Sequence, residues 1–168
     1  MLNQVQHDNF TKKYKMYLNY LEGYLTREDF VTIQEKISGI ENSTFGEIRL
    51  CLKKKRRFKE KKFNPKEFAL LEFHKLGMQN TVHKTGILLL IIFEERVFEI
   101  IADEGINNKI GQEKWYEISM AMSNEFKKGN YKNGILDCLN EMGEILIKEF
   151  PPAGMRDTNE LSDEVVVE

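Results

Sequence analysis

The 168-residue sequence predicts an α/β fold in which helices cover both faces of a mixed β-sheet. Residues 86–93 form an unbroken apolar run that is too short for an ordinary helix, which predicts a central strand buried on both faces. After a polar turn at 94–96, residues 97–103 follow a period of two and complete an antiparallel hairpin. An alternating segment at 45–53 precedes a predicted helix and then the central strand. This order predicts a right-handed β-α-β unit with parallel strands.

The composition is that of one soluble domain. A net charge of −2 with 31% charged residues describes an ordinary solvated surface, so no specific nucleic-acid partner is expected. Cys51 and Cys138 lie far apart without neighbouring ligands at zinc spacing, which predicts neither a disulfide framework nor a zinc cluster. The sequence shows neither the apolar segment of a signal peptide nor a run long enough to span a membrane. We therefore expect a cytoplasmic monomer.

Residues 1–24 are predicted to form an N-terminal helical extension, because aromatic and leucine side chains recur at helical spacing over 10–22. This stripe fits packing on the domain, and it also fits binding to a partner or a membrane surface. The domain itself, residues 25–152, begins with a helix that Thr26 caps and Asp29 completes as a capping box. The expected buried residues of this helix are Phe30, Ile33, Ile37 and Ile40.

A basic run at 53–62 follows the first strand. It fits a solvated loop, and it also fits a patch that binds nucleic acid or another anionic surface. Asn64, followed by Pro65 and by Glu67 at the capping-box position, predicts the start of the next helix, and Gly77 predicts its end. The expected buried residues of this helix are Phe68, Leu71 and Leu76.

Two more helices are predicted after the hairpin, one from about residue 112 to Gly129 and one from 131 to Pro151. Their expected buried residues are Trp115, Ile118, Met122, Phe126, Tyr131, Ile135, Leu139, Met142, Leu146 and Phe150. Residues 153–168 carry acidic side chains without a helical stripe, so we expect a tail that is disordered or draped over the surface.

Polar groups gather at one edge of the predicted sheet. The hairpin returns to the edge at which both parallel strands begin, which places Glu47, Thr85 and Asp103 near one another. Together with Glu104 and Asn107, they offer the hard oxygen ligands that Ca²⁺ or Mg²⁺ prefers. The alternative is that an acidic residue at a strand end caps the following turn.

Cys51 and Arg57 match the bare spacing of the cysteine phosphatase loop. That loop needs small residues so that successive amides converge on the phosphate, whereas the intervening residues here are long and basic. We interpret the match as accidental.

Five segments in order, ENSTFGEIRL, HKLGMQNT, TGILLLIIFEERVFEIIADEGIN, KWYEISMAMSNEFKKGNYKNGI and EFPP, resemble the TPM domain family. The resemblance implies a Rossmann-like three-layer α/β/α sandwich, an acidic pocket that binds Ca²⁺ or Mg²⁺ in some members, and phosphatase activity in the plant members. Glu47 matches the acid of the family's G-E-I-R segment, and Asp103 matches its D-x-G-I segment. Thr85 replaces the asparagine of the family's R-N-G segment, so a hydroxyl stands in place of a side-chain amide.

Three functional hypotheses follow. The preferred one is a non-enzymatic interaction or regulatory module that binds Ca²⁺ or Mg²⁺ through Glu47 and Asp103, with Glu104, Thr85 and Asn107 as helpers and with a protein partner that the sequence does not name. The second is a metal-assisted phosphatase that acts on phosphomonoesters in the same pocket. The third is an adaptor that binds an anionic partner through residues 53–62.

Overall fold

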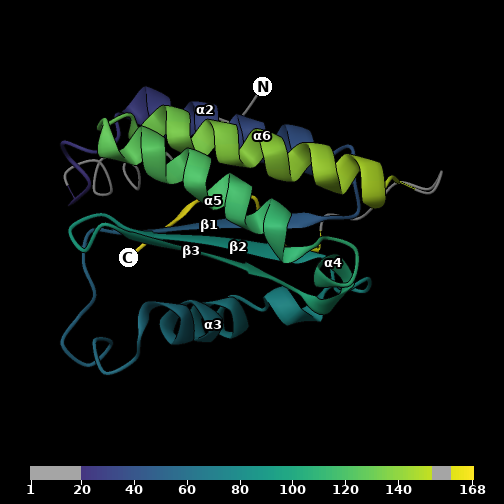
Figure 1. The fold of residues 1–168 in the computed structure, drawn as a ribbon, viewed down its shortest axis with the longest axis horizontal. Coiled ribbons are helices and arrows are strands. Elements are labelled where there is room, and N and C mark those ends of the chain that lie inside the picture. Colours follow the sequence, from purple (N-terminus) through teal and green to yellow (C-terminus); the bar gives the residue numbers. More distant parts are fainter. Residues whose placement is uncertain (1–19, 153–159) are drawn as a thin grey trace, which may run out of the picture.

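The computed structural model describes residues 20–152 and 160–168. Within them a four-stranded sheet lies between two helical layers, which confirms the predicted three-layer α/β/α sandwich (Figure 1). Helices α2, α5 and α6 cover one face of the sheet, and α3 covers the other. The strands are β1 (Glu47–Lys53), β2 (Gly86–Ile92), β3 (Val97–Ala102) and β4 (Val166–Val167). The helices are α2 (Arg27–Glu41), α3 (Pro65–Lys75), the 3₁₀ turn η1 (Met78–Asn80), α4 (Glu104–Asn107), α5 (Gln112–Lys127) and α6 (Tyr131–Glu149).

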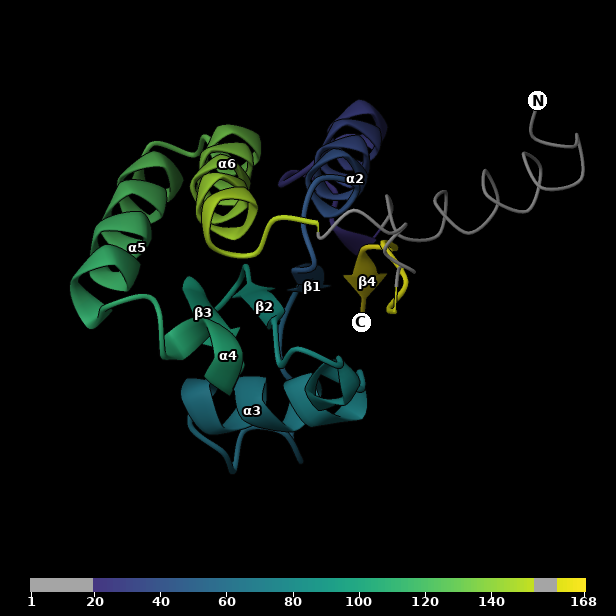
Figure 2. The ribbon, with the colours of Figure 1, turned by 90° about the vertical axis from the view of Figure 1, so that its right-hand side faces the viewer.

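The strand order in the sheet is β3-β2-β1-β4, as the end-on view of Figure 2 shows. β1 pairs with β2 in parallel, and β2 pairs with β3 antiparallel, so both predicted pairings are confirmed. All seven residues of β2 are buried, because it has a neighbour on each side and a helical layer on each face.

Local sequence signals set the start of two helices. Thr26 and Asp29 form the predicted capping box of α2, and Asn64 and Glu67 form that of α3. Gly77 follows α3 with a φ of 73°, a left-handed conformation that glycine adopts without strain.

The sheet separates two hydrophobic cores. The larger core lies under α2, α5 and α6, and the smaller one lies under α3. The predicted buried row of α2 is confirmed, but the predicted burial of Leu71 in α3 is wrong, because its side chain is 45% exposed. α3 instead packs on the sheet through Phe68, Ala69, Glu72 and Phe73.

Described residues near both ends of the chain pack against the domain, although the sequence predicted an extension at one end and a tail at the other. Residues 1–19 lie outside the described residues, and with them most of the predicted N-terminal helix, but Leu21 and Leu25 are buried in the larger core. Residues 160–168 were expected to be disordered or draped over the surface, but they include β4, which pairs in parallel with β1. Three consecutive valines at 165–167 give too short a signal to predict a strand, and the open edge of β1 provides the partner that forms it.

No helix in the described ranges is both long and apolar enough to cross a membrane.

Candidate functional site

One row of residues crosses the sheet at the edge where β1 and β2 begin. Glu47 pairs with Gly86, and the Asp103 amide donates a hydrogen bond of 2.9 Å to the Gly86 carbonyl. Cys51 of β1 and Ile101 of β3 both belong to the core under α3. Because side chains alternate along a strand, Glu47 and Asp103 lie on that same face, with one strand between them.

The space over Gly86 is filled by the backbone of η1. A methyl group added at Gly86 would lie 2.8 Å from the Met78 carbonyl oxygen, so a larger residue does not fit there. The Met78 carbonyl therefore lies over the middle of the row, flanked by the strand positions of Glu47 and Asp103.

The two carboxylates of the row have different surroundings. Glu47 is only 3% exposed, and its Oε1 accepts a hydrogen bond of 2.8 Å from the Glu160 amide. Asp103 caps α4, since its Oδ1 accepts a hydrogen bond of 2.8 Å from the Glu104 amide. The second oxygen, Oδ2, is buried and has no hydrogen-bond partner among the described residues. One oxygen of Asp103 thus caps the following turn, as the alternative prediction from the sequence had it, and the other oxygen takes no part in the cap.

The remaining predicted residues fall into two groups. Glu104 and Asn107 are exposed on α4 beside Asp103, and the Asn107 side-chain amide donates a 2.6 Å hydrogen bond to the Ala102 carbonyl. Thr85 is fully buried, and its hydroxyl donates a 2.8 Å hydrogen bond to the Phe45 carbonyl. Strand alternation assigns Thr85 to the face opposite Asp103. The fold therefore gathers Asp103, Glu104 and Asn107 on one turn, with Glu47 across the row and Thr85 apart.

A further acidic residue that the sequence analysis missed is Glu41, at the end of α2. Its side chain accepts a 2.6 Å hydrogen bond from the Ile48 amide at the start of β1. Burial raises the pKa of Glu41 to about 9; the Ile48 hydrogen bond opposes the rise, and the nearby Asp163 and Glu47 add to it. Glu41 ends a predicted helix and Asp163 lies in the tail, so no local pattern marks them as neighbours.

A second polar cluster lies towards the opposite end of β1. Ligand atoms of Cys51, Glu72 and Glu168 all lie within 4.8 Å of one another. Two ammonium groups already neutralise the carboxylates: Lys53 lies 3.1 Å from Glu168, and Lys75 lies 3.2 Å from Glu72 and 2.5 Å from Glu168. This is an ion-pair network in which a further cation would have to displace two lysines.

The cysteine phosphatase spacing does not form a reactive site. Burial raises the pKa of the Cys51 thiol to about 12, so the nucleophilic thiolate does not form near neutral pH. Arg57 is exposed and lies 3.9 Å from Glu60.

The basic run is partly used inside the protein. Lys53 is only 1% exposed and pairs with Glu60 and Glu168. Arg56 binds the Glu95 carboxylate at 2.6 Å. Exposed cations of the run remain at Lys55, Arg57, Lys59, Lys61 and Lys62.

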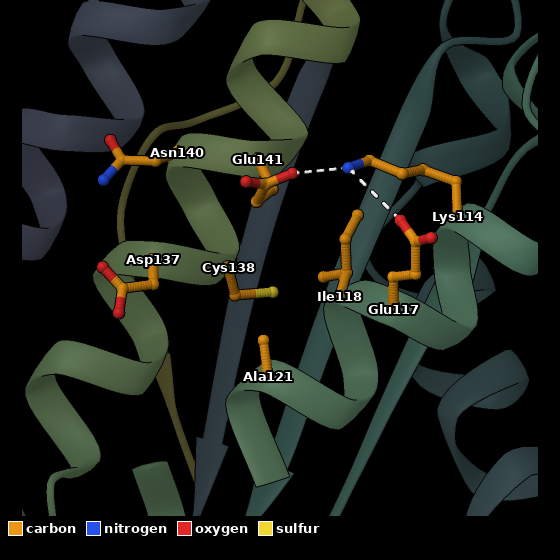
Figure 3. Close-up of a pocket in the computed structure, with 8 residues that line it drawn as sticks. All are labelled: Lys114, Glu117, Ile118, Ala121, Asp137, Cys138, Asn140 and Glu141. Atoms are coloured by element: carbon orange, nitrogen blue, oxygen red, sulfur yellow. Dashed lines mark hydrogen bonds and ion pairs between the residues drawn. The ribbon is translucent and has the colours of Figure 1, made fainter. Parts of the chain in front are cut away.

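A groove between α5 and α6 was also not predicted (Figure 3). Cys138 lies between the two helices, and burial raises the pKa of its thiol to about 12. Lys114 contacts Glu141 at 2.7 Å and Glu117 at 3.8 Å, so the one cation among the lining residues is already paired. Figure 3 shows these paired side chains spanning the two helices, as in a stabilising helix contact.

Comparison with known proteins gives these features a context. The sequence model of the TPM domain matches residues 18–145. The NMR structure of the BA42 protein from the psychrophilic bacterium Bizionia argentinensis has a TM-score of 0.78 and 32% sequence identity, covering 88% of this chain and 98% of that chain.

Two more distant structures are similar in fold. The N-terminal domain of a P. gingivalis protein has a TM-score of 0.65 at 16% identity, covering 77% of this chain and 81% of that chain. The N-terminal domain of the cg2496 protein from Corynebacterium glutamicum has a TM-score of 0.59 at 12% identity, covering 84% and 86%. No curated protein matches the sequence.

Proposed function

The chain belongs to the TPM domain family, as its sequence predicts, and on this premise we propose that it is an interaction or regulatory module that binds Ca²⁺ or Mg²⁺ at the sheet edge beside α4. Asp103 is the central ligand of the proposed site. Glu104, Asn107 and Glu47 are the residues that complete it.

The observation that carries the proposal is the buried Oδ2 of Asp103, which has no hydrogen-bond partner among the described residues. A carboxylate oxygen removed from water without a partner is costly, and a divalent cation is a partner that carboxylates accept. The donor chemistry around it fits a hard cation, because Glu104 and Asn107 lie within the next four residues on the same short helix.

Glu47 and Thr85 serve mainly to hold the start of β1 in place, and less as direct ligands of the ion. Glu47 shares its Oε1 with the Glu160 amide, so its entry into the ligand set requires that bond to be shared or exchanged. Thr85 holds the Phe45 carbonyl at the entry to β1 and thereby fixes the start of the strand that carries Glu47. A bound ion would neutralise the acidic edge and couple α4 to β1, which is the physical basis of a regulatory role.

The test is a ¹H-¹⁵N NMR titration of the metal-free protein with Ca²⁺ and then Mg²⁺. We expect saturable shifts confined to residues near 41–49, 83–87 and 103–108. The informative variant is Asp103→Asn, because asparagine still caps α4 while losing the charge that the cation needs. Asp137→Asn, a change at an exposed carboxylate of α6, is the matched control and should leave the titration unchanged.

Saturable shifts that persist in Asp103→Asn, or signals that do not move at millimolar metal, contradict the proposed site. If the first outcome is seen, the bound ion lies elsewhere. If the second is seen, this chain lacks the metal binding found in some members of the family.

Phosphomonoester hydrolysis remains the second candidate. Cys51 does not supply its nucleophile, because the raised pKa keeps the thiol protonated. The assay is hydrolysis of p-nitrophenyl phosphate with added Mg²⁺. Turnover lost in both Glu47→Ala and Asp103→Ala supports an enzyme, whereas metal binding without turnover supports the module.

A further inference from the structure

Residues 160–168 run beside β1, and β4 pairs with its outer edge at Cys51 and Leu52, where Figure 2 shows β4 next to β1. At the start of the strand the Glu160 amide binds Glu47. In the middle, the Arg49 guanidinium donates to the carbonyls of Ser162 and Glu164. At the end, the Glu168 amide donates a 3.0 Å hydrogen bond to the Leu52 carbonyl.

Side chains of the segment, as well as its backbone, contact the rest of the protein. Val165 is only 5% exposed and belongs to the larger core, whereas Val166 packs against the core under α3. Neighbouring residues of an extended segment point to opposite faces, so two adjacent aliphatic side chains fill both sites at once.

A buried cation lies at the end of β1 beside the segment. Lys53 is 1% exposed, and its ammonium lies 3.1 Å from the Glu168 carboxylate and 3.3 Å from that of Glu60. Lys75 also contacts Glu168, at 2.5 Å. If the bound segment had no carboxylate at this point, the buried Lys53 ammonium would keep only Glu60 as an ion-pair partner. This edge of β1 therefore favours a segment with an acidic residue at the position of Glu168.

The segment is held less extensively than the other strands. Only Val166 and Val167 enter the ladder with β1, whereas β1 and β2 pair over seven residues from Glu47 to Lys53. The pairings of β1 with β2 and of β2 with β3 involve no residue of the segment, so we expect its release to be a local opening and not global unfolding. Release exposes a row of unpaired backbone groups and the Lys53 ammonium.

We propose that the outer edge of β1 binds a strand of a partner protein, and that residues 160–168 are an internal segment that the partner displaces. The partner contributes an extended segment, parallel to β1, with adjacent aliphatic residues followed by a carboxylate residue. Backbone pairing supplies affinity and the Lys53–Lys75 pair supplies selectivity, as in other cases of strand addition. The strand-binding edge shares one bond with the proposed metal site, from the Glu160 amide to Glu47, but its β-pairing and its contacts with Lys53 and Lys75 do not require a bound ion.

The test uses the full chain with its own segment weakened by Val165→Asp, which places a charge in the larger core. A labelled peptide with the sequence of residues 160–168 is titrated in a fluorescence anisotropy assay. We expect the variant to bind the peptide at least about tenfold more tightly than the wild-type chain, in which the internal segment competes. Chemical shifts of the β2–β3 hairpin show that the variant is folded.

Selectivity is tested in the same background. Lys53→Met, or a peptide carrying Glu168→Gln, should weaken binding by about tenfold or more, because each removes a charge-assisted hydrogen bond. Lys54→Met is the matched control, since the Lys54 side chain is partly exposed and its ammonium pairs with Glu94, at 4.0 Å, and not with Glu168. If Val165→Asp does not fold, Glu168→Lys weakens the internal segment through repulsion from Lys53 and Lys75 without changing the core.

A folded, weakened chain that does not bind the peptide overturns the proposal, as does binding that Lys53→Met leaves unchanged. Exchange of residues 160–168 between two copies, seen as a wild-type dimer that does not bind added peptide, overturns the assignment to a partner protein.

Discussion

The sharpest stability prediction concerns Glu41. Burial raises the pKa of its carboxyl group from an ordinary value of 4.5 to about 9. Between these values the folded protein holds a proton on Glu41 that the unfolded chain has lost. The stability contributed by this group is therefore fully present below about pH 4.5 and is lost as the pH rises towards about 9.

The change to make is Glu41→Gln, which keeps an oxygen to accept the 2.6 Å hydrogen bond from Ile48 but does not titrate. One proton difference corresponds to about 1.4 kcal/mol per pH unit, so the wild-type chain should lose up to about 2.7 kcal/mol relative to Glu41→Gln between about pH 6 and pH 8. The assay is urea denaturation at several pH values with a chelator present.

Two further variants make the result specific. Asp163→Asn should flatten part of the wild-type slope, because the Asp163 carboxylate contributes to the raised pKa of Glu41. Glu35→Gln, at an exposed carboxylate on the same helix, should change nothing. Equal pH dependence of the free energy of unfolding in the wild-type chain and in Glu41→Gln would refute the reasoning.

Two other predictions concern packing and thiol reactivity. Gly86→Ala should destabilise the fold by about 1–3 kcal/mol in denaturant unfolding, because the new methyl group would lie 2.8 Å from the Met78 carbonyl oxygen; unchanged stability would mean that η1 moves freely. The Cys51 thiol should react with a disulfide reagent at pH 8 only after unfolding, since it is buried and its pKa is raised to about 12. Rapid labelling of the native protein would contradict this.

Much of the fold is predictable from the sequence because its signals are local. The capping box of Thr26 and Asp29 involves residues three apart, and the apolar run of β2 needs no distant partner to be recognised. Leu71 shows the limit of such signals: it is apolar, but α3 presents Phe68 and Glu72 to the sheet instead, and the buried Glu72 carboxylate pairs with Lys75.

The candidate site was predictable in part for the same reason. Strand alternation and hairpin reversal place Glu47 and Asp103 on one edge, and the structure puts them in one row around Gly86. Thr85 lies at the same edge of the sheet, but it is one residue before Gly86, so its side chain points to the opposite face. Glu41 was missed because its perturbation arises from burial beside Asp163, which is far away in the sequence.

The sequence by itself determined the layers, the β-α-β unit, the hairpin and the family, since helix caps and hydrophobic periods depend on residues within a few positions of one another. Tertiary structure alone decided that Val166 and Val167 become the fourth strand and that the buried Lys53 meets Glu168, 115 residues away. The physical reason is that β1 becomes an edge strand with unpaired backbone groups, and Lys53 becomes a buried charge, only after the rest of the chain has packed around them.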